Sequence, residues 1–223
     1  MSETPRPPPA FPRYTRSERV ADGLVHGLGL LLAAAALPWL LWTGLGHSGG
    51  AVRLSLVLYA LGAALMLGCS AIYNRLKEPR RKALFRRFDR AAIFIMIAGT
   101  YSPLALAGLD RPTGAGLMAF EWGLAGIGAA LAIGFPRRAE RLLMLFYLVM
   151  GWAILAVLPS LLAAVGATVV GLFLAGGLIY TAGVGLHASV GLKFHNVLWH
   201  GCVLSAAGCH YVAILLAVAG ARS

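Results

Sequence analysis

Seven long apolar stretches run through the sequence, and they limit the possible folds more than any other feature. The hydrocarbon core of a bilayer is about 30 Å thick, and a helix of roughly 20 apolar residues crosses it. Because lipid offers no partner for a free backbone amide, such segments must be helical. We therefore predict an all-α, polytopic membrane protein, a bundle of seven transmembrane helices over residues 24–45, 51–73, 91–108, 115–134, 142–160, 165–186 and 196–219.

The composition excludes several other classes of protein. Hydrophobic residues make up 59% of the 223 positions and charged residues only 12%, whereas soluble proteins average roughly 45–50% and 25%. A soluble globule of this size lacks the interior to bury so much apolar surface, which excludes an ordinary cytosolic enzyme and a disordered chain. The net charge of +11 lies mostly in short loops, so we expect no nucleic acid as a partner.

Basic residues mark one side of the membrane. Sixteen of the 19 lie in the N-terminal segment and in the loops after the second, fourth and sixth apolar stretches. Cytoplasmic loops carry an excess of Lys and Arg, so we predict a cytoplasmic N-terminus and a C-terminus outside. Residues 1–19 are predicted to form a proline-rich, disordered cytosolic tail and residues 20–223 the membrane domain. The expected location is the bacterial inner membrane.

Polar residues gather at one depth in four of the predicted helices. An ionisable residue inside a span costs about 2.5–3.5 kcal/mol on insertion scales, so a shared location is informative. Glu18, Asp22 and His26 are spaced by four and form one stripe at the cytoplasmic end of the first helix. Six further residues lie at the same end of the second, third and seventh helices: Ser70, Asn74, Asp89, His195, Asn196 and His200. His210 lies roughly 15 Å deeper on the seventh helix.

Two classes of chemistry fit this set of side chains. A metal ion with a hydroxyl and carboxylates nearby suits hydrolysis, whereas a chain of carboxylates and imidazoles suits proton transfer. Asn196 and His200 have the i,i+4 spacing of paired metal ligands, although zinc prefers imidazole, thiolate or carboxylate to an amide. Glu121, beside Trp122, is the main polar residue toward the opposite end, and we interpret it as an anchor or helix-pairing residue.

Several short motifs together resemble the hemolysin III branch of the progestin and adipoQ receptor (PAQR) family. The resemblance covers about residues 17–219, and the block from Asp89 to Pro103 is its most specific part. The motifs are Glu18-x3-Asp22-x3-His26, Cys69-Ser-Ala-Ile-Tyr-Asn74, Phe88-Asp-Arg-Ala-Ala-Ile, Ile97-Ala-Gly-Thr-Tyr-Ser-Pro103, Trp199-His200 and Cys209-His210.

The resemblance implies a seven-helix bundle with a cytosolic N-terminus and a zinc ion near the cytoplasmic face. In the family, an S-x3-H motif and an H-x3-H motif supply three histidine ligands, and the serine and an aspartate support a bound water. Ser70 and Asp89 match the serine and the aspartate that support the bound water, so the resemblance implies that they are the catalytic residues. The three ligand positions carry Asn74, Asn196 and His200. Because an amide is a weak, neutral ligand, this sequence favours an altered or metal-free site over zinc.

Three functions remain open at this point. The first is hydrolysis of a lipid amide, as related receptors and ceramidases imply, with Ser70 and Asp89 orienting water and His200 holding the metal ion. The second is a non-enzymatic protein that binds, senses or permeabilises membranes through a metal-free site. The third is a proton-coupled transporter with a relay through Glu18, Asp22, His26, Asp89 and His200. Membrane lipids are the expected partners in each case.

Overall fold

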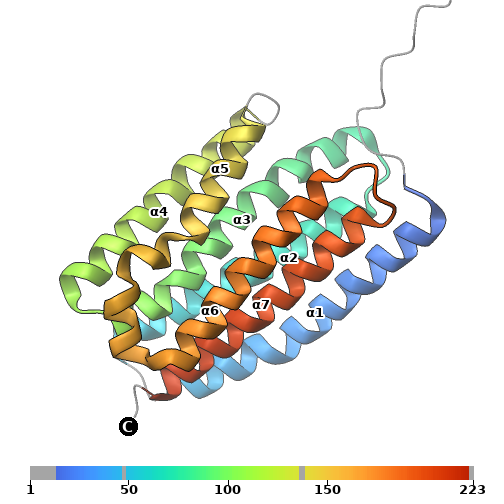
Figure 1. Cartoon of the computed structure of the whole chain (residues 1–223). Helices are drawn as coiled ribbons and strands as arrows, with labels where there is room; N and C mark the ends of the chain where they lie inside the picture. The colour runs from blue at the N-terminus through green and yellow to red at the C-terminus, as the bar shows by residue number, and fades with distance from the viewer. Residues whose placement is uncertain (1–13, 47–48, 136–138, 221–223) are drawn as a thin grey trace, which may run out of the picture.

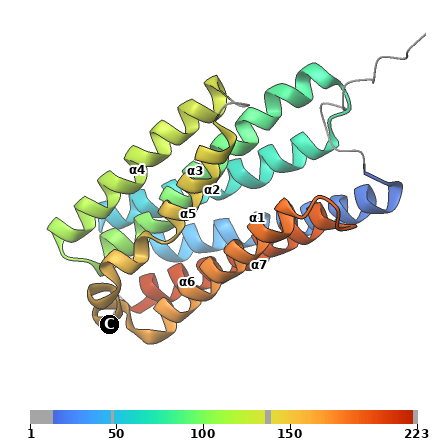
Figure 2. The ribbon, with the colours of Figure 1, turned by 45° about the horizontal axis from the view of Figure 1, so that its top comes forward.

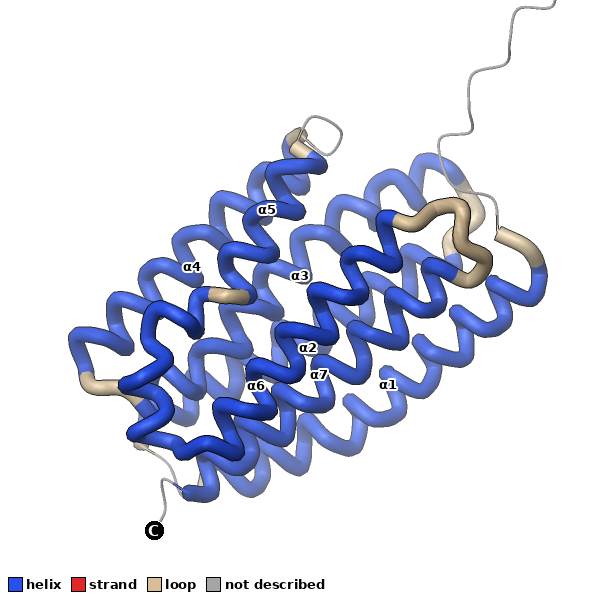
Figure 3. The backbone as a smooth tube through the Cα atoms, in the orientation of Figure 1, coloured by secondary structure: helices blue, strands red, loops and turns tan. Residues whose placement is uncertain are grey.

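The computed structural model describes residues 14–46, 49–135 and 139–220, and within these ranges the chain is helical with no strand. The helices, in chain order, are α1 Arg16–Leu45, α2 Gly50–Arg75, α3 Pro79–Gly108, α4 Arg111–Gly134, α5 Glu140–Gly151, the short 3₁₀ helix η1 Ala153–Val157, α6 Leu158–Ala188 and α7 His195–Gly220. In the bundle shown in Figure 1, α3 packs against α2, α4, α5, α6 and α7, and α7 also packs against α1 and α6. The loop between α6 and α7 lies at one end of the bundle, whereas the connection that follows α5 lies part-way along it (Figure 3).

Six helical runs among the described residues are long and apolar enough to cross a membrane. This confirms a polytopic, all-helical membrane protein. Five of the runs are single helices, and the sixth is the 49-residue stretch Glu140–Ala188. That stretch holds two of the predicted spans, 142–160 and 165–186, and it contains α5, η1 and α6.

The stretch from α5 to α6 is not one straight helix. Gly166 has φ 80° and ψ 168°, a conformation that glycine adopts without steric cost, and the helical path breaks there. A second break follows Gly151, where η1 begins. The Tyr101 hydroxyl stabilises this second break, because it donates to the Gly151 carbonyl at 2.8 Å and accepts from the Ile154 amide at 3.1 Å. The predicted helix over 142–160 is therefore interrupted.

Capping residues begin three helices earlier than the apolar pattern predicted. Thr15 and Glu18 form a capping box, so α1 begins at Arg16 instead of residue 24, inside the predicted tail. The Glu78 carboxylate accepts from two amides of the first turn of α3, which therefore begins at Pro79 instead of residue 91. Asp110 caps α4, which begins at Arg111. The earlier part of the predicted tail, residues 1–13, lies outside the described residues.

Close packing fixes the positions of α1, α2, α3 and α7. A Cβ at Gly62 would lie 2.9 Å from the Ile95 carbonyl oxygen, and one at Gly99 would lie 3.0 Å from that of Leu58, so the two glycines let α2 and α3 touch through their backbones. Helix α1 packs against both α2 and α7 (Figure 2). Polar side chains on these helices can therefore meet at the end where α1, α3 and α7 begin and α2 ends, which we call the basic end.

Candidate functional site

Asp22 is the centre of a group of polar side chains at the basic end. Its carboxylate oxygen Oδ1 lies 2.6 Å from Nδ1 of His200 and 3.1 Å from Nδ2 of Asn196, both on α7. A carboxylate oxygen accepts hydrogen bonds, so both nitrogens act as donors. The side chains of Asp22 and His200 are only 11% and 12% exposed. The carboxylate thus joins α1 to α7 in a nearly buried setting.

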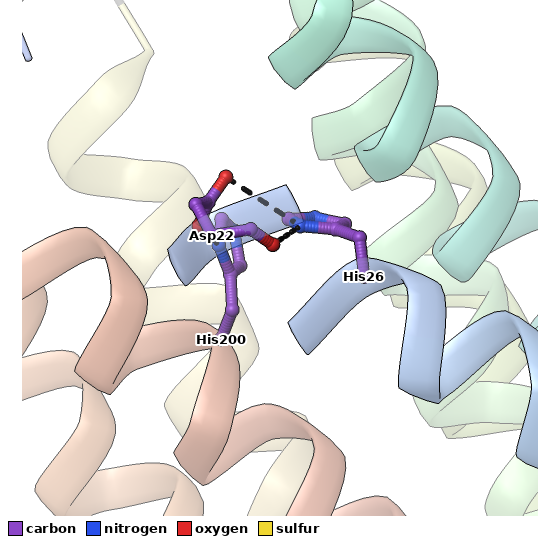
Figure 4. A group of neighbouring side chains, drawn as sticks. All are labelled: Asp22, His26 and His200. Carbon is purple, nitrogen blue, oxygen red and sulfur yellow. Dashed lines mark hydrogen bonds and ion pairs between the residues drawn. The ribbon is translucent and has the colours of Figure 1, made fainter. Parts of the chain in front are cut away.

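His26 lies one helical turn after Asp22 and faces α2. Its Nδ1 lies 2.8 Å from the Asp22 carbonyl oxygen and 3.5 Å from the Asp22 carboxylate. Its Nε2 lies 3.2 Å from the Ser70 hydroxyl and 3.4 Å from the Asn74 amide nitrogen. The rings of His26 and His200 meet edge to face, with centroids 4.3 Å apart. Figure 4 shows Asp22, His26 and His200 converging from α1 and α7.

Ser70 connects this group to α3. Its hydroxyl is a hydrogen-bond partner of the Asp89 carboxyl as well as of His26. The Asn74 amide donates to the Ser70 carbonyl at 3.0 Å. The structure therefore brings together seven of the residues singled out in the sequence, from four helices: Asp22, His26, Ser70, Asn74, Asp89, Asn196 and His200.

Three further residues predicted for this cluster make other contacts. Glu18 bonds Thr15 at the start of α1 and accepts from the Phe194 amide at 3.0 Å, so it fixes the loop before α7. His195 bonds the Leu192 carbonyl in the same loop. His210 is buried in the bundle, where its Nε2 lies 3.0 Å from the Phe173 carbonyl oxygen.

The side chains at the expected zinc positions do not fit that metal. Asn74 and Asn196 are amides, and only His200 carries an imidazole. A different set, Asp22, His26 and His200, offers one carboxylate and two imidazoles whose ligand atoms lie within 4.8 Å of one another. Two imidazoles and a carboxylate are a donor set known from catalytic zinc sites. The chain is thus compatible with zinc through a set in which α1 supplies two of the three groups.

A cavity of about 410 Å³ extends from this group into the bundle. His26, Ser70, Asn74 and Asp89 line its polar end. Apolar side chains make up most of the remaining wall, and Tyr101 and His210 also contribute to it. The cavity is therefore a largely apolar volume that borders the hydrogen-bonded polar group.

The sequence predicted that Asp22 and His26 belong to the polar cluster but placed neither at an expected catalytic or metal-ligand position. Their i,i+4 spacing puts a carboxylate and an imidazole on one helix face, as a pair of metal ligands requires. Their partners are distant in sequence, since His26 and Ser70 are 44 positions apart and Asp22 and His200 are 178 apart. Spacing alone did not reveal these pairs.

Comparison with known proteins identifies relatives across most of the chain. A family model described as "Haemolysin-III related" matches residues 14–211. The chain is 30% identical to Hemolysin-3 of Bacillus cereus, covering 90% of this chain and 92% of that protein. It is 28% identical to the Hemolysin-3 homolog of Bacillus subtilis (strain 168), with 91% and 95% covered. It is also 28% identical to the human monocyte to macrophage differentiation factor, with 70% and 67% covered. No solved structure shows a significant match.

Proposed function

Because the chain belongs to the haemolysin-III related family, we propose that it is a membrane-embedded hydrolase whose substrate is an amphiphile with an acyl amide or ester bond. The observation that carries the proposal is that the polar group around Asp22, His26 and His200 borders the largely apolar cavity. An acyl chain in the cavity would place its carbonyl carbon beside Ser70 and His26. Hydrolysis needs an activated oxygen nucleophile and a proton carrier, and both kinds of group line this end.

The proposed topology has seven crossings, with a cytoplasmic N-terminus and an outside C-terminus. A regular helix of 49 residues would be roughly 74 Å long, more than twice the thickness of a bilayer core. The break at Gly166 divides Glu140–Ala188 into two crossings in this proposal. The basic loops then face the cytoplasm, the site opens toward it, and the bacterial inner membrane is the proposed location.

A zinc ion at this site would be held by Asp22, His26 and His200. When bound, it would polarise a carbonyl oxygen or lower the pKa of a bound water. The chain's own groups supply the remaining functions. Asn196 donates to Asp22 and fixes its carboxylate, and the Ser70 hydroxyl and Asp89 lie where a proton must be held or moved during hydrolysis.

The test is release of fatty acid by purified protein in detergent or vesicles from a panel of long-chain acyl amides and esters. We expect turnover that falls about a hundredfold or more in Asp89→Asn and in His26→Gln. Ser55→Ala is the matched control, because Ser55 is a buried serine on α2 that bonds the Val52 carbonyl and lies outside the site.

Other outcomes would favour the remaining functions. Equal activity in wild type, Asp89→Asn and His26→Gln would contradict a hydrolytic role for the site. Proton flux into vesicles without any fatty-acid release would replace hydrolysis with transport. Membrane leakage that persists in both variants would point to a non-enzymatic protein.

A further inference from the structure

Ser70, His26 and Asp22 form a connected line of hydroxyl, imidazole and carboxylate. The Ser70 oxygen lies 3.2 Å from Nε2 of His26, and Nδ1 of the same ring lies 3.5 Å from the Asp22 carboxylate. The side chains of His26 and Asp22 are only 10% and 11% exposed. A nucleophile, a base within hydrogen-bond reach and a third group that orients the base define an activated serine.

The hydrogen bonds of His26 determine which of its nitrogens can act as the base. Nδ1 lies 2.8 Å from the Asp22 carbonyl oxygen, which can only accept, so Nδ1 carries the proton in the neutral ring. Nε2 is then the acceptor. Its two neighbours, the Ser70 hydroxyl and the Asn74 amide nitrogen, are both able to donate to it.

Asp22 keeps the imidazole in this orientation through two groups. Its carbonyl oxygen holds Nδ1–H, and its carboxylate lies near the same nitrogen. The carboxylate is itself fixed by His200 and Asn196. A fixed carboxylate beside Nδ1 also stabilises the imidazolium that forms when Nε2 takes a proton.

Asn74 stands at the position where the family resemblance implies a histidine that binds the metal ion, and its amide supplies hydrogen-bond donors instead. One Asn74 N–H bonds the Ser70 carbonyl at 3.0 Å, and the same nitrogen lies 3.4 Å from Nε2 of His26. When Nε2 takes the Ser70 proton it can no longer accept from Asn74, and the second N–H of Asn74 can then donate to the oxygen that becomes negative during attack on a carbonyl. An imidazole bound to a metal ion has no such free donor on its coordinating nitrogen.

We infer that, when Asp22 and His26 hold no metal ion, these two residues activate Ser70 as a covalent nucleophile that cleaves the acyl bond. The inference rests on the proposed function, because it names the attacking group at the same site. The Ser70 oxygen bonds to the acyl carbon as its proton passes to Nε2 of His26. The C–N or C–O bond then breaks, and the leaving group takes that proton.

Water completes the reaction with no further reagent. His26 accepts a proton from the water as its oxygen bonds to the acyl carbon, and the Ser70 oxygen leaves and takes the proton back. The products are a fatty acid and an amine or alcohol. Asp89, which contacts the Ser70 hydroxyl, acts in this scheme as a positioning residue.

The experiment uses a long-chain alkyl fluorophosphonate, a reagent that modifies activated serines, on the full chain in detergent with a strong chelator present. We expect a phosphonyl adduct on the peptide that contains Ser70. Modification is expected to be lost in Ser70→Ala, about a hundredfold slower in His26→Gln, and unchanged in Ser55→Ala. Acyl-enzyme trapped with an activated ester is expected at the same residue.

A second variant keeps the test valid if Ser70→Ala does not fold. In Ser70→Cys the thiol takes the place of the hydroxyl, and we expect an alkyl iodoacetamide to modify it faster than the same thiol in the double variant Ser70→Cys, His26→Gln. Equal rates in the single and the double variant would contradict activation by His26.

The outcomes separate this inference from the proposed function. Fatty-acid release that persists in Ser70→Ala but stops with the chelator would overturn the serine nucleophile and leave the proposed hydrolysis intact. Modification of Ser70 without turnover of any acyl lipid would support the nucleophile and contradict the proposed substrate class. Absence of both modification and turnover would overturn both.

Discussion

Two carboxylates, Asp22 and Glu121, are buried in the same bundle with opposite surroundings. Asp22 is 8% exposed and accepts hydrogen bonds from His200 and Asn196. Glu121 on α4 is fully buried, and neither of its carboxyl oxygens has a hydrogen-bond partner. Burial of a polar group costs free energy unless it is hydrogen-bonded. Asp22 therefore offsets its burial with hydrogen bonds, whereas the carboxyl of Glu121 is desolvated without any hydrogen bond to offset the loss of free energy.

The helices around the two carboxylates differ in the same way. Around Asp22, four helices contribute side chains that bond one another and line a cavity. Around Glu121, α4 presents buried Leu117 and Ala125 on the turns before and after it. The prediction that Glu121 anchors the chain at an interface is wrong, because the side chain is 0% exposed. Its position on the buried face agrees with the helix-pairing interpretation.

The largest effect is expected for Asp22→Ala. This change leaves the donors of His200 and Asn196 without their acceptor, and each such group costs roughly 1–3 kcal/mol. We expect the free energy of unfolding in mixed micelles to fall by about 2–5 kcal/mol and hydrolysis to be lost. Asp22→Asn, which keeps the shape and one acceptor oxygen, is expected to lose less stability. Equal stability in the wild type and both variants would contradict a central role for Asp22.

Tyr101→Phe is expected to lower the free energy of unfolding less than Asp22→Ala does, and it tests the polar group at the helix break after Gly151. The hydroxyl serves both the Gly151 carbonyl and the Ile154 amide, so its removal leaves two backbone groups unpaired. We expect a loss of about 1–3 kcal/mol in unfolding free energy. Hydrogen exchange at Ile154 should rise in the variant, and unchanged exchange there would show that the bond does not hold the break.

Glu121→Met is expected to change stability in the opposite direction. The thioether fills similar space without a polar group to desolvate, so we expect a gain of roughly 1–3 kcal/mol in unfolding free energy. Glu121→Gln is the matched control, because it keeps an unpaired polar group and should gain less. A loss of stability in Glu121→Met would mean that the carboxyl has a stabilising partner in the membrane.

The smallest effect concerns Glu78, a third carboxylate that is exposed at the start of α3. Hydrogen bonds from the amides of Arg81 and Arg80 lower its pKa below the usual 4.5. A lowered pKa in the fold means that the ionised group stabilises α3 at neutral pH, and that this contribution is lost as pH falls through the lowered pKa. Thermal unfolding of wild type and Glu78→Gln should therefore differ at pH 7 and converge as pH falls from 4.5 through the lowered pKa. A constant difference across this range would contradict the cap.

The stripe Glu18, Asp22 and His26 shows how far a local pattern can predict a site. Spacing by four correctly placed all three on one helix face, and their shared depth with Ser70 and His200 predicted a cluster. Only the packing of α1 between α2 and α7 separated their roles. Asp22 and His26 entered the cavity group, whereas Glu18 became a cap that also holds the Phe194 amide.

The sequence alone determined that this is a helical membrane protein. Long apolar segments must form helices in lipid whatever their tertiary packing, because lipid offers the backbone no hydrogen-bond partner. The end of each helix at which the polar residues lie followed from local counting along the chain. Which of these residues touch was decided only by tertiary structure. The bond between Asp22 and His200 joins positions 178 apart, and its distance of 2.6 Å depends on how α1 packs against α7. No periodicity within one helix encodes that packing.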